Sequence, residues 1–516
     1  MHPSVHALTT PDKPALIMAR SGEQITYAEL DALSNRNAHA FRTAGLKAGD
    51  TVAICLPNLI GFIPLVWGAH RAGLRYVCVS SRLTASELTY ILKDCNARLL
   101  VLSPDVEVAK NLDLARALDT VAYAYGGPLA ALPRWEPLSD RQSSTPLPDQ
   151  TAGTEMLYSS GTTGRPKGIA LPFETDDILV PDALTMMGAG LFGLNDQTVY
   201  LSPAPLYHAA PLRWTLAVTR LGGTAIIMES YDPELALASI QRHKVTAGQF
   251  VPTHFIRMLK LPDELRQQYD ISSLKLAIHA AAPCPVPIKE AMIDWWGPVL
   301  VEYYAGTEGN GLTMINSADW LTHKGSVGPA VMGKVRICND EGEELPQGET
   351  GLIYFSDGRA FNYHNDPEKS AESLNRHGWS TLGDIGRLDE DGFLYLSDRK
   401  SFMIISGGVN IYPQEIENLL IQHPAVSDVA VVSAPCPEMG EQVVAVIQPA
   451  HWSDDPSIQS GLAEELTLWT RQHLSGVKTP RRIDFMAQLP RHDTGKLYKR
   501  LLRDQYWANV QSTVPA

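Results

Sequence analysis

Glycine and hydroxyl residues gather in residues 157–168, which read Leu-Tyr-Ser-Ser-Gly-Thr-Thr-Gly-Arg-Pro-Lys-Gly. Such glycines let the backbone take turns closed to other residues and bring its N–H groups close to an anion. The glycines are Gly161, Gly164 and Gly168, and the hydroxyl donors are Ser159, Ser160, Thr162 and Thr163. Lys167 adds a mobile positive charge. These residue types and their spacing predict a phosphate-binding segment.

A Walker-type phosphate loop does not fit this segment. That loop has a glycine directly before its lysine and Ser or Thr directly after it, whereas here Pro166 precedes Lys167 and Gly168 follows it. On composition alone a plain surface loop is the alternative, because Gly, Ser and Thr are also common loop residues. The choice between these two interpretations depends on the rest of the chain.

The order of residues in 157–168 resembles the nucleotide-binding loop of the AMP-forming adenylating enzymes. This family comprises acyl-CoA synthetases, adenylation domains of peptide synthetases and firefly-type luciferases. Further segments match it in the expected order and over essentially the full length of the chain. They are residues 205–210, 280–285, 304–308, 381–384, 398–399, 400–417 and 489–496. The resemblance implies that the phosphate-binding segment holds the polyphosphate of ATP.

The resemblance assigns an adenine pocket and a metal site to two of these segments. The residues implied in the wall of the adenine pocket are Ala281, Ala282 and Pro283. The ring of Tyr304 is implied to lie on the adenine, the hydroxyl of Thr307 to contact phosphate, and the carboxylate of Glu308 to hold Mg²⁺. An aromatic face suits a purine, and a hard oxygen ligand suits a magnesium ion bound mainly through substrate phosphates. A strand ending in a polar turn explains each residue singly, but not their combination.

Three further residues are implied to contact the ribose or the acyl substrate. Asp384 matches the residue that binds both ribose hydroxyls, and Arg399 matches the second ribose contact. An isolated Asp in a Gly-rich turn is normally only a turn residue, but its spacing to Arg399 favours the functional interpretation. His208 is implied to act as a gate near the carboxylate, although a lone histidine is more often structural.

Residues 400–417 resemble the family's hinge and the loop that approaches the CoA tunnel. Gly407 and Gly408 are implied to let pantetheine pass close to the backbone. Ser401 stands where the family usually has Asp or Lys at the hinge. Rotation requires a residue that tolerates changed backbone dihedral angles rather than a charged residue, so a hinge is still expected but its location is left open. On a loop near the C-terminus, Lys496 matches the catalytic lysine that bridges the carboxylate and the α-phosphate.

The composition is that of an ordinary globular protein of 516 residues, 44% hydrophobic and 19% charged. The formal net charge of −14 argues against nucleic-acid binding, which would call for a basic surface. The six cysteines lack C-x-x-C spacing, which favours reduced thiols over disulfides or a zinc site. The most apolar window, residues 54–69, contains two prolines and is too short to span a bilayer. We expect a cytoplasmic protein without a signal peptide, and a homodimer is one assembly compatible with the sequence.

Helix and strand patterns alternate along the first part of the chain. Capping boxes at Thr26 with Glu29 and at Thr84 with Glu87 predict two helix starts. Such alternation predicts a parallel sheet covered by helices. Residues 125–150, rich in Pro, Ser and Gly, are expected to form a loop.

The expected fold class is α/β, and the resemblance implies a luciferase-like adenylating fold. A large N-terminal domain, residues 1–400, would contain helix-covered mixed sheets plus a distorted β-barrel and would bind AMP and the acyl group. A small, mobile α+β domain, residues 401–516, would carry Lys496.

The function implied is that of a carboxylate–CoA ligase. ATP and a carboxylate give acyl-AMP and pyrophosphate, and CoA then displaces AMP. The segments expected to line the acyl pocket are those around His208, residues 250–252, 280–282 and 306–311. They are mostly small or apolar, which predicts a bulky apolar acid of the aryl, fatty or steroid type. The alternatives are an adenylating enzyme with another acceptor, such as a carrier-protein thiol or oxygen, and a non-catalytic nucleotide-binding protein.

Overall fold

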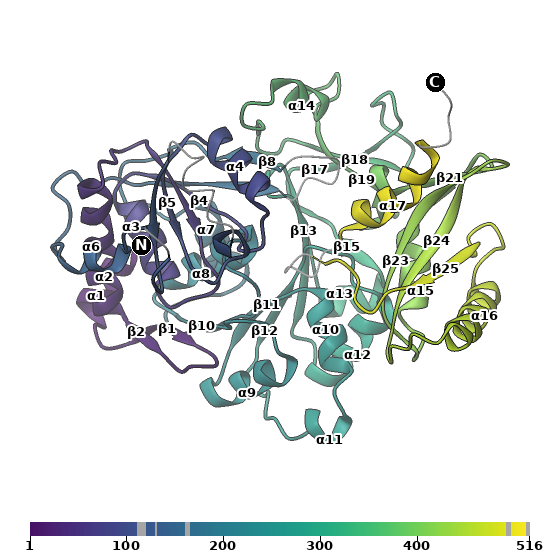
Figure 1. Ribbon diagram of the computed structural model, residues 1–516, viewed down its shortest axis with the longest axis horizontal. Coiled ribbons are helices and arrows are strands. Elements are labelled where there is room, and N and C mark those ends of the chain that lie inside the picture. The colour runs from purple at the N-terminus through teal and green to yellow at the C-terminus, as the bar shows by residue number, and fades with distance from the viewer. Residues whose placement is uncertain (111–119, 130–131, 160–165, 492–496, 512–516) are drawn as a thin grey trace. The chain divides into compact units, whose positions relative to one another are not determined.

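The structure is a computed structural model, and it describes residues 1–110, 120–129, 132–159, 166–491 and 497–511 (Figure 1). The chain forms two compact units. The first consists of Met1–His279, Ile293–Val301 and Phe361–Ala371, and the second of Ala280–Met292, Glu302–Ala360 and Glu372–Ala516. The second unit groups the C-terminal residues with earlier segments, and the expected domain boundary at residue 400 stays a prediction.

One sheet of the first unit has the strand order β6-β5-β3-β4-β7-β8. Its strands are β3 (Thr51–Cys55), β4 (Arg75–Cys78), β5 (Ala97–Leu102), β6 (Val121–Ala124), β7 (Thr154–Ser159) and β8 (Lys167–Ala170). Neighbouring strands are parallel except for β7 and β8, which form an antiparallel pair. Helix α4 (Ala85–Asp94) buries Leu88, Ile91 and Leu92 in the core of this sheet. The predicted parallel, helix-covered sheet is confirmed.

A second sheet in the first unit has the order β12-β11-β9-β10-β1-β2. Its strands are β1 (Pro14–Met18), β2 (Gln24–Thr26), β9 (Val199–Ser202), β10 (Thr224–Ile227), β11 (Ala247–Phe250) and β12 (Leu276–His279). These strands also run parallel, except for the antiparallel pair of β1 and β2. The carboxyl ends of the parallel strands therefore share one edge of the sheet.

Two helices of the first unit begin where the sequence predicts capping boxes. Thr26 and Glu29 form a reciprocal capping box at the start of α2 (Tyr27–Thr43), and Thr84 and Glu87 form another at α4. Each box satisfies N–H groups that a first helical turn leaves unpaired. Further helices are α1 (Pro3–Thr9), α3 (Phe62–Arg71), α6 (Trp135–Asp140), α7 (Ala183–Leu191), α8 (Ala209–Leu221), α9 (Pro233–His243), α10 (Pro252–Leu259) and α11 (Asp263–Arg266), with a 3₁₀ turn η1 (Glu107–Lys110).

The expectation of a loop over residues 125–150 is wrong at α6. Trp135 is fully buried, and its indole Nε1 donates to Oδ1 of Asn37 at 2.8 Å. This contact joins two residues that are far apart in the sequence. It stabilises a short helix that the local Pro- and Ser-rich sequence does not favour.

The second unit contains an antiparallel sheet where the resemblance implies a barrel. The strand order is β15-β20-β19-β18-β17, with antiparallel neighbours throughout. The strands are β15 (Ser326–Gly328), β17 (Lys334–Cys338), β18 (Gly351–Ser356), β19 (Ser380–Leu388) and β20 (Leu394–Arg399). Also present are β14 (Leu312–Asn316), β16 (Ala330–Met332) and α13 (Ser317–Thr322), whereas β13 (Leu300–Ala305), α12 (Val286–Trp296) and α14 (Pro367–Glu372) are divided between the units.

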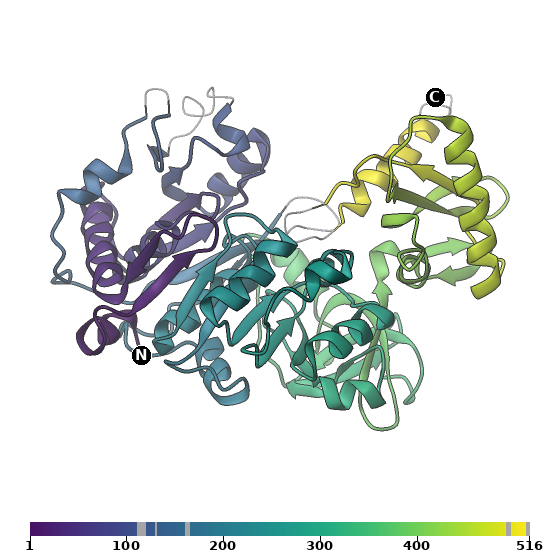
Figure 2. The same cartoon turned by 90° about the horizontal axis from the view of Figure 1, so that it is seen from below.

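After the 3₁₀ turn η2 (Lys400–Phe402), the chain forms an α+β module. Its strands are β21 (Ile404–Ser406), β22 (Val409–Ile411), β23 (Val426–Cys436), β24 (Gly440–Pro449) and β25 (Arg482–Phe485), and its helices are α15 (Pro413–Leu420), α16 (Pro456–His473) and α17 (Lys499–Gln511). Alternate residues of β23 enter two cores, one containing α15 and α16 and the other α17. Helices α16 and α17 accordingly lie on opposite sides of the strands (Figures 1 and 2).

All six cysteines are free thiols in the structure, and Cys55, Cys78, Cys95 and Cys338 are buried. In the described part of the chain, no helix combines the length and the apolar character needed to cross a membrane.

Candidate nucleotide-binding and active site

A buried carboxylate, Asp384, organises the best-defined polar cluster of the second unit. Its Oδ1 lies 2.9 Å from Nε of Arg399, and its Oδ2 accepts the hydroxyl of Tyr304 at 2.7 Å. Asp384 is 7% exposed. A carboxylate has about four acceptor sites, so each oxygen retains capacity for one more donor. The structure thus brings together three residues that the sequence assigns to adenosine binding.

The backbone around Asp384 explains how it reaches this position. Gly383 has a φ of +80° within β19, and its N–H donates to Oγ1 of Thr381 at 3.1 Å. The Thr381 hydroxyl in turn donates to the carbonyl of Ile353 on β18 at 2.7 Å. A positive φ inside a strand is accessible to glycine at little cost and accompanies irregular pairing. The Thr-Leu-Gly-Asp sequence therefore bends the strand just before the carboxylate.

The ring of Tyr304 is held by aromatic packing as well as by its hydroxyl. It stacks on Phe355 of β18, with ring centroids 6.2 Å apart and an interplanar angle of 26°. Burial raises the pKa of the Tyr304 phenol well above its usual value, and the carboxylate of Asp384 raises it further. The phenol therefore remains protonated and donates to Asp384 at neutral pH. No sequence signal indicated Phe355 as a support for this ring, because its alternating strand position is typical of any core residue.

Arg399 remains a cation in this cluster. Burial lowers its pKa, but the nearby Asp384, Tyr304 and Glu308 outweigh that effect, so the pKa lies above the usual range. Glu308 also raises the pKa of Tyr304. The carboxylate of Glu308 therefore lies close enough to Tyr304 and Arg399 to interact with both.

The segment after β13 presents Glu308 beside a glycine that leaves room for it. A Cβ on Gly306 would lie 2.7 Å from Oε2 of Glu308 and 2.3 Å from Cδ1 of Leu382. Such distances are far below van der Waals contact, so any side chain at 306 would displace the carboxylate. Glu308 is 9% exposed and Thr307 is half-buried. One buried carboxylate fits a magnesium ion that takes most of its ligands from substrate phosphates and water.

The second predicted adenine segment carries an unusual backbone conformation. Ala281 has a φ of +76°, in the left-handed region, and both Ala281 and Ala282 are exposed. A non-glycine residue pays roughly 1–2 kcal/mol to adopt this conformation. Strain of this kind gathers at ligand sites, and here it agrees with a role for residues 281–283 in the adenine pocket.

The described residues of the predicted phosphate-binding segment include the end of β7 and the start of β8, which pair antiparallel in the first unit. Ser159 is the last residue of β7, and it pairs with Lys167, the first residue of β8. Nζ of Lys167 lies 5.0 Å from the centre of the Tyr363 ring, a cation–π distance. Ser160, Gly161, Thr162 and Thr163, together with Gly164, lie outside the described residues.

His208 lies at the start of α8, where it occupies the N-cap position and contacts the ring of Tyr207 at 4.4 Å. One turn further along the helix, Nε of Arg213 donates to Oε1 of Glu155 at 2.5 Å. Glu155 belongs to β7, so this ion pair ties the helix of His208 to the hairpin of the phosphate-binding segment. The sequence did not reveal this pair, because no local pattern links residues so far apart in the chain.

Gly407 and Gly408 form the turn of the β21–β22 hairpin. Their φ angles are +57° and +80°, and Ser406 pairs with Val409 across the turn. Two consecutive positive φ angles are typical of a type I′ hairpin turn, which strongly prefers glycine. Their role toward CoA stays a prediction, as does the role of Ser401, which lies in the 3₁₀ turn η2.

Lys496 lies outside the described residues, so its catalytic role also stays a prediction. Within the described ranges there is no group of three or more His, Cys, Asp or Glu residues that could hold a metal ion. The magnesium assignment therefore rests on Glu308 and on the phosphates of a substrate.

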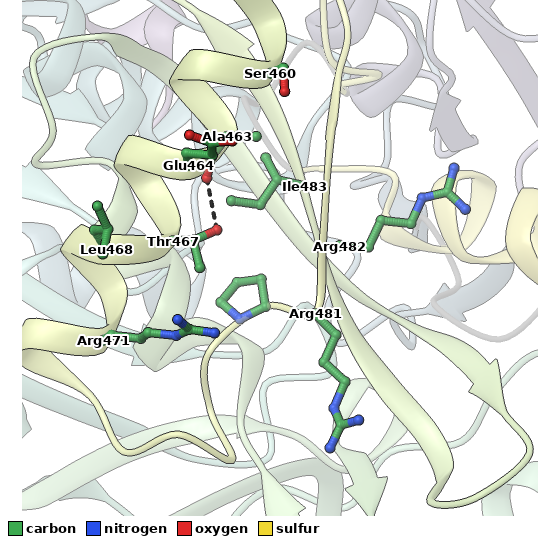
Figure 3. Close-up of a pocket in the computed structure, with 10 residues that line it drawn as sticks. Ser460, Ala463, Glu464, Thr467, Leu468, Arg471, Arg481, Arg482 and Ile483 are labelled. Atoms are coloured by element: carbon green, nitrogen blue, oxygen red, sulfur yellow. Dashed lines mark hydrogen bonds between the residues drawn. The ribbon is translucent and has the colours of Figure 1, made fainter.

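A cavity of about 440 Å³ lies between α16 and β25 in the C-terminal module (Figure 3). Thr467 in its wall donates to the carbonyl of Ala463 at 2.7 Å, while Arg482 turns away and pairs with Asp484 at 2.9 Å. None of the described residues that the sequence assigns to the site lines this cavity. It is thus separate from the described residues of the predicted nucleotide site.

Two family profiles match the chain. That of the AMP-binding enzymes matches residues 4–361, and that of the AMP-binding enzyme C-terminal domain matches residues 415–496. The first range includes the phosphate-binding segment and the Tyr304–Glu308 segment, and the second ends at Lys496.

Curated relatives match almost the full length. A feruloyl-CoA synthase of Amycolatopsis sp is 33% identical over 95% of this chain and 96% of its own length. The long-chain-fatty-acid–CoA ligase FadD13 of Mycobacterium tuberculosis is 31% identical over 98% and 97%. The fatty acid–[acyl-carrier-protein] ligase ScoC of Streptomyces coeruleorubidus is 31% identical over 98% and 96%.

Solved structures share the fold over almost the whole chain. The o-succinylbenzoate CoA synthetase of Bacillus subtilis, in complex with its acyl-adenylate intermediate, has a TM-score of 0.79 with 26% identity and covers 97% of both chains. The amide bond synthetase McbA of Marinactinospora thermotolerans has a TM-score of 0.78 with 25% identity, covering 98% of this chain and 99% of its own. The luciferase-like adenylating fold is confirmed. The chain therefore belongs to the AMP-binding enzymes and, within the adenylate-forming superfamily, to the AMP-forming acyl-CoA synthetases.

Proposed function

We propose that this protein activates a bulky apolar carboxylic acid with ATP and transfers the acyl group to the thiol of coenzyme A. The observation that carries the proposal is the buried carboxylate of Asp384, oriented by Tyr304 and Arg399. Its free acceptor sites suit the two hydroxyls of a ribose, and the aromatic ring beside it suits an adenine.

In the first half-reaction, a carboxylate oxygen of the acid attacks the α-phosphorus of ATP. The bond to the β-phosphate oxygen breaks, and pyrophosphate leaves with the electron pair. Because the substrate supplies the nucleophile, the protein contributes position and charge neutralisation. We assign the polyphosphate to Ser159, Ser160, Gly161, Thr162, Thr163 and Lys167. Thr307 contacts phosphate, and Lys496 bridges the carboxylate and the α-phosphate.

Magnesium would be held by Glu308 together with substrate phosphates. When bound, the ion neutralises phosphate charge and orients the leaving pyrophosphate. The room left by Gly306 and the exposure of 9% at Glu308 support this assignment.

In the second half-reaction, the CoA thiol attacks the acyl carbonyl, its proton passes to solvent, and the bond to AMP breaks. We propose that residues 401–516 move as a unit between the two half-reactions, which withdraws Lys496 and brings Gly407 and Gly408 to the pantetheine. Both residues of this turn are glycines with positive φ angles, so the turn itself carries no side chain. His208 would act as a gate at the carboxylate.

The acyl substrate is proposed to be an aryl or long-chain acid. The names of two relatives specify feruloyl and long-chain fatty acyl groups. The segments assigned to the pocket agree, since Ala282, Gly306 and Gly311 are small and residues 250–252 are apolar. The ring of Phe250, however, packs against Phe255 and Trp296 at 5.6 and 5.3 Å, so it belongs to the core as well.

A second candidate acceptor is the thiol of an acyl carrier protein. One relative is named as a fatty acid–[acyl-carrier-protein] ligase and is 31% identical. Both acceptors present the same pantetheine thiol, so the adenylation site would be identical and only the acceptor surface would differ.

The test combines a panel of carboxylic acids with two acceptors. Ferulate, medium- and long-chain fatty acids and a steroid acid are incubated with ATP and Mg²⁺, and pyrophosphate release is measured with CoA, with a pantetheinylated carrier protein and with neither. We expect rapid release with CoA and an apolar acid, and formation of the corresponding thioester. Release that does not depend on any acid, or an acyl product found only on the carrier protein, would contradict the proposal.

The role of Lys496 is tested by separating the half-reactions. Lys496→Ala is expected to abolish acyl-AMP formation, while thioester formation from supplied acyl-AMP survives. The physical reason is that the lysine neutralises charge only while pyrophosphate is leaving. An equal loss of both half-reactions would contradict this role.

A further inference from the structure

A buried ion pair joins two helices of the C-terminal module around the edge of its sheet. Nζ of Lys499, the first residue of α17, lies 2.8 Å from Oε1 of Glu417 on α15, and the side chains are only 8% and 7% exposed. The same carboxylate oxygen accepts the backbone N–H of Val431 at 2.6 Å. In the described structure β23 pairs only with β24, so Glu417 satisfies an N–H on the edge of the sheet.

Lys499 also contacts the turn that precedes the module. Its ammonium lies 5.2 Å from the centre of the Phe402 ring, which ends the 3₁₀ turn η2. One cation therefore connects the start of α17 to α15, to the edge of β23 and to the turn where the sequence places the hinge.

Arg491, the residue just before segment 492–496, is held to β23, the strand whose edge Glu417 contacts. Nη2 of Arg491 donates to Oδ1 of Asp428 on β23 at 2.5 Å, and Nε of Arg491 pairs with the second carboxylate oxygen. Arg491 and Leu497 form a β-bridge, and the N–H of Tyr498 donates to the carbonyl of Pro490 at 2.9 Å. The residues that enter and leave segment 492–496 are thus held together and anchored by two ion pairs.

Stability alone does not account for the buried pair. Replacing a buried ion pair with neutral groups of similar size is often neutral or stabilising, because desolvation offsets the attraction. Its geometric effect is different: two donors, the ammonium of Lys499 and the N–H of Val431, converge on one oxygen of Glu417 and fix where α17 begins. Lys496 lies three residues before Lys499, and a misplacement of about 1 Å in a catalytic group costs on the order of a hundredfold in rate.

We propose that Lys499 and Glu417 are positioning residues for Lys496 in the adenylation half-reaction. Neither residue touches the substrate in this account, and their effect passes through the lysine. The inference rests on the proposed function, because it takes Lys496 as the residue that bridges the carboxylate and the α-phosphate.

The test measures both half-reactions in Lys499→Met, Lys499→Arg and the double variant Glu417→Gln with Lys499→Met. Methionine keeps the unbranched apolar stem on Phe402, and glutamine keeps an oxygen for the N–H of Val431, so the double variant leaves no buried charge unpaired. We expect the adenylation kcat, measured as pyrophosphate release without CoA, to fall by about tenfold or more. The KM for ATP and thioester formation from supplied acyl-AMP should stay within about twofold, and arginine should restore most of the adenylation rate.

A matched control is a second ion pair of α15, the helix that carries Glu417. Lys478 pairs with Glu415 of α15 at 2.6 Å, but these side chains are 30% and 42% exposed and lie away from segment 492–496 in the sequence. Lys478→Met should leave both half-reactions unchanged. Thermal unfolding establishes that each variant is folded.

Three outcomes would overturn the inference. The first is a folded double variant that forms acyl-AMP at the wild-type rate, and the second is an equal loss of both half-reactions. The third is a Lys496→Ala variant that still forms acyl-AMP, which would remove the positioning role but leave the ligase activity intact. A wild-type protein that forms no thioester with any acid would instead refute the proposed function, and this inference with it.

Discussion

Asp384 and Arg399 lie directly opposite each other on β19 and β20, with Nε of Arg399 2.9 Å from Oδ1 of Asp384. The hydroxyl of Tyr304, at the end of β13, binds the other oxygen. Three strands thus orient one carboxylate in advance of any ligand. Such orientation lowers the entropic cost of binding, because the side chain need not be ordered when the ribose arrives.

The first prediction concerns Asp384→Asn. The asparagine keeps the size of the side chain but loses the charge and one acceptor oxygen, and hydrogen bonds to a charged group contribute roughly 1.5–3 kcal/mol. We expect kcat/KM for ATP to fall by about 10- to 100-fold, measured by pyrophosphate release at varied ATP concentration. Arg376→Ala removes an exposed ion pair with Glu343 in the same unit and should leave this value unchanged. Unaltered ATP kinetics in D384N would refute the ribose role.

The second prediction concerns magnesium at Glu308. Glu308→Gln removes the negative charge, and Gly306→Ala keeps the charge but places a Cβ 2.7 Å from the present position of Oε2. Both variants should require a higher Mg²⁺ concentration for half-maximal pyrophosphate release, because a hard oxygen ligand is weakened or displaced. A magnesium titration at saturating ATP measures the effect, with thermal unfolding as the check on folding. Titration curves that overlay the wild-type curve would contradict the metal role.

Much of the fold could be predicted because local signals agree with tertiary structure. The capping boxes at Thr26 and Thr84 and the alternation of buried strands with helices are visible in short windows of sequence. Helix α6 shows where this fails, since it is stabilised by the contact of Trp135 with Asn37. Helix α17 is a second such case, since its buried face meets β23 through a few residues, such as Leu502, rather than through a long apolar stripe.

The candidate site could be predicted as a set of residues, but not as a geometry. Spacing indicated Tyr304, Asp384 and Arg399, and the structure brings them into hydrogen-bonding contact. No sequence pattern indicated that Phe355 supports the Tyr304 ring or that Glu417 reaches Lys499, because such pairs depend on how strands and helices pack. Residues 160–165 and 492–496 lie outside the described residues, so their predicted roles remain open to the experiments proposed above.

The third prediction concerns the backbone of Ala281. Its φ of +76° costs an alanine roughly 1–2 kcal/mol, whereas glycine adopts this region freely but loses about 0.5–1 kcal/mol of chain entropy on folding. Ala281→Gly is therefore expected to leave the melting temperature unchanged or to raise it. Ala282→Gly, at an exposed neighbour without a positive φ, should lower it slightly. A clear loss of stability in A281G that A282G does not show would contradict backbone strain at Ala281.

The fourth prediction concerns pH and His254. This ring is buried, stacks on Tyr231 at 3.9 Å, and accepts the N–H of Val251 at Nδ1. Burial, aided by the charge of Arg257, lowers its pKa from 6.5 to about 3. Between these values the unfolded chain binds a proton that the folded chain does not, so the stability that neutral His254 provides is complete above pH 6.5 and is lost as the pH falls toward 3.

His254→Phe removes this titration. Lowering the pH from 7 to 5 should therefore reduce the stability of the wild type relative to H254F by about 2 kcal/mol, given about 1.4 kcal/mol per pH unit. Thermal unfolding of both proteins across this range measures the difference. A gap that stays constant with pH would show that the pKa of His254 is the same in the folded and the unfolded chain, which would contradict the lowered value.

The central claim is that the carboxylate of the acid attacks the α-phosphorus of ATP. The most direct measurement uses the acid that gives the fastest pyrophosphate release, labelled with ¹⁸O in its carboxylate, in a reaction with ATP, Mg²⁺ and CoA. Mass spectrometry of the products should find one ¹⁸O atom in AMP and none in pyrophosphate, because the bond between the carboxylate oxygen and phosphorus survives when CoA displaces AMP. Label absent from AMP, or ADP and labelled phosphate as the products, would contradict an acyl-adenylate.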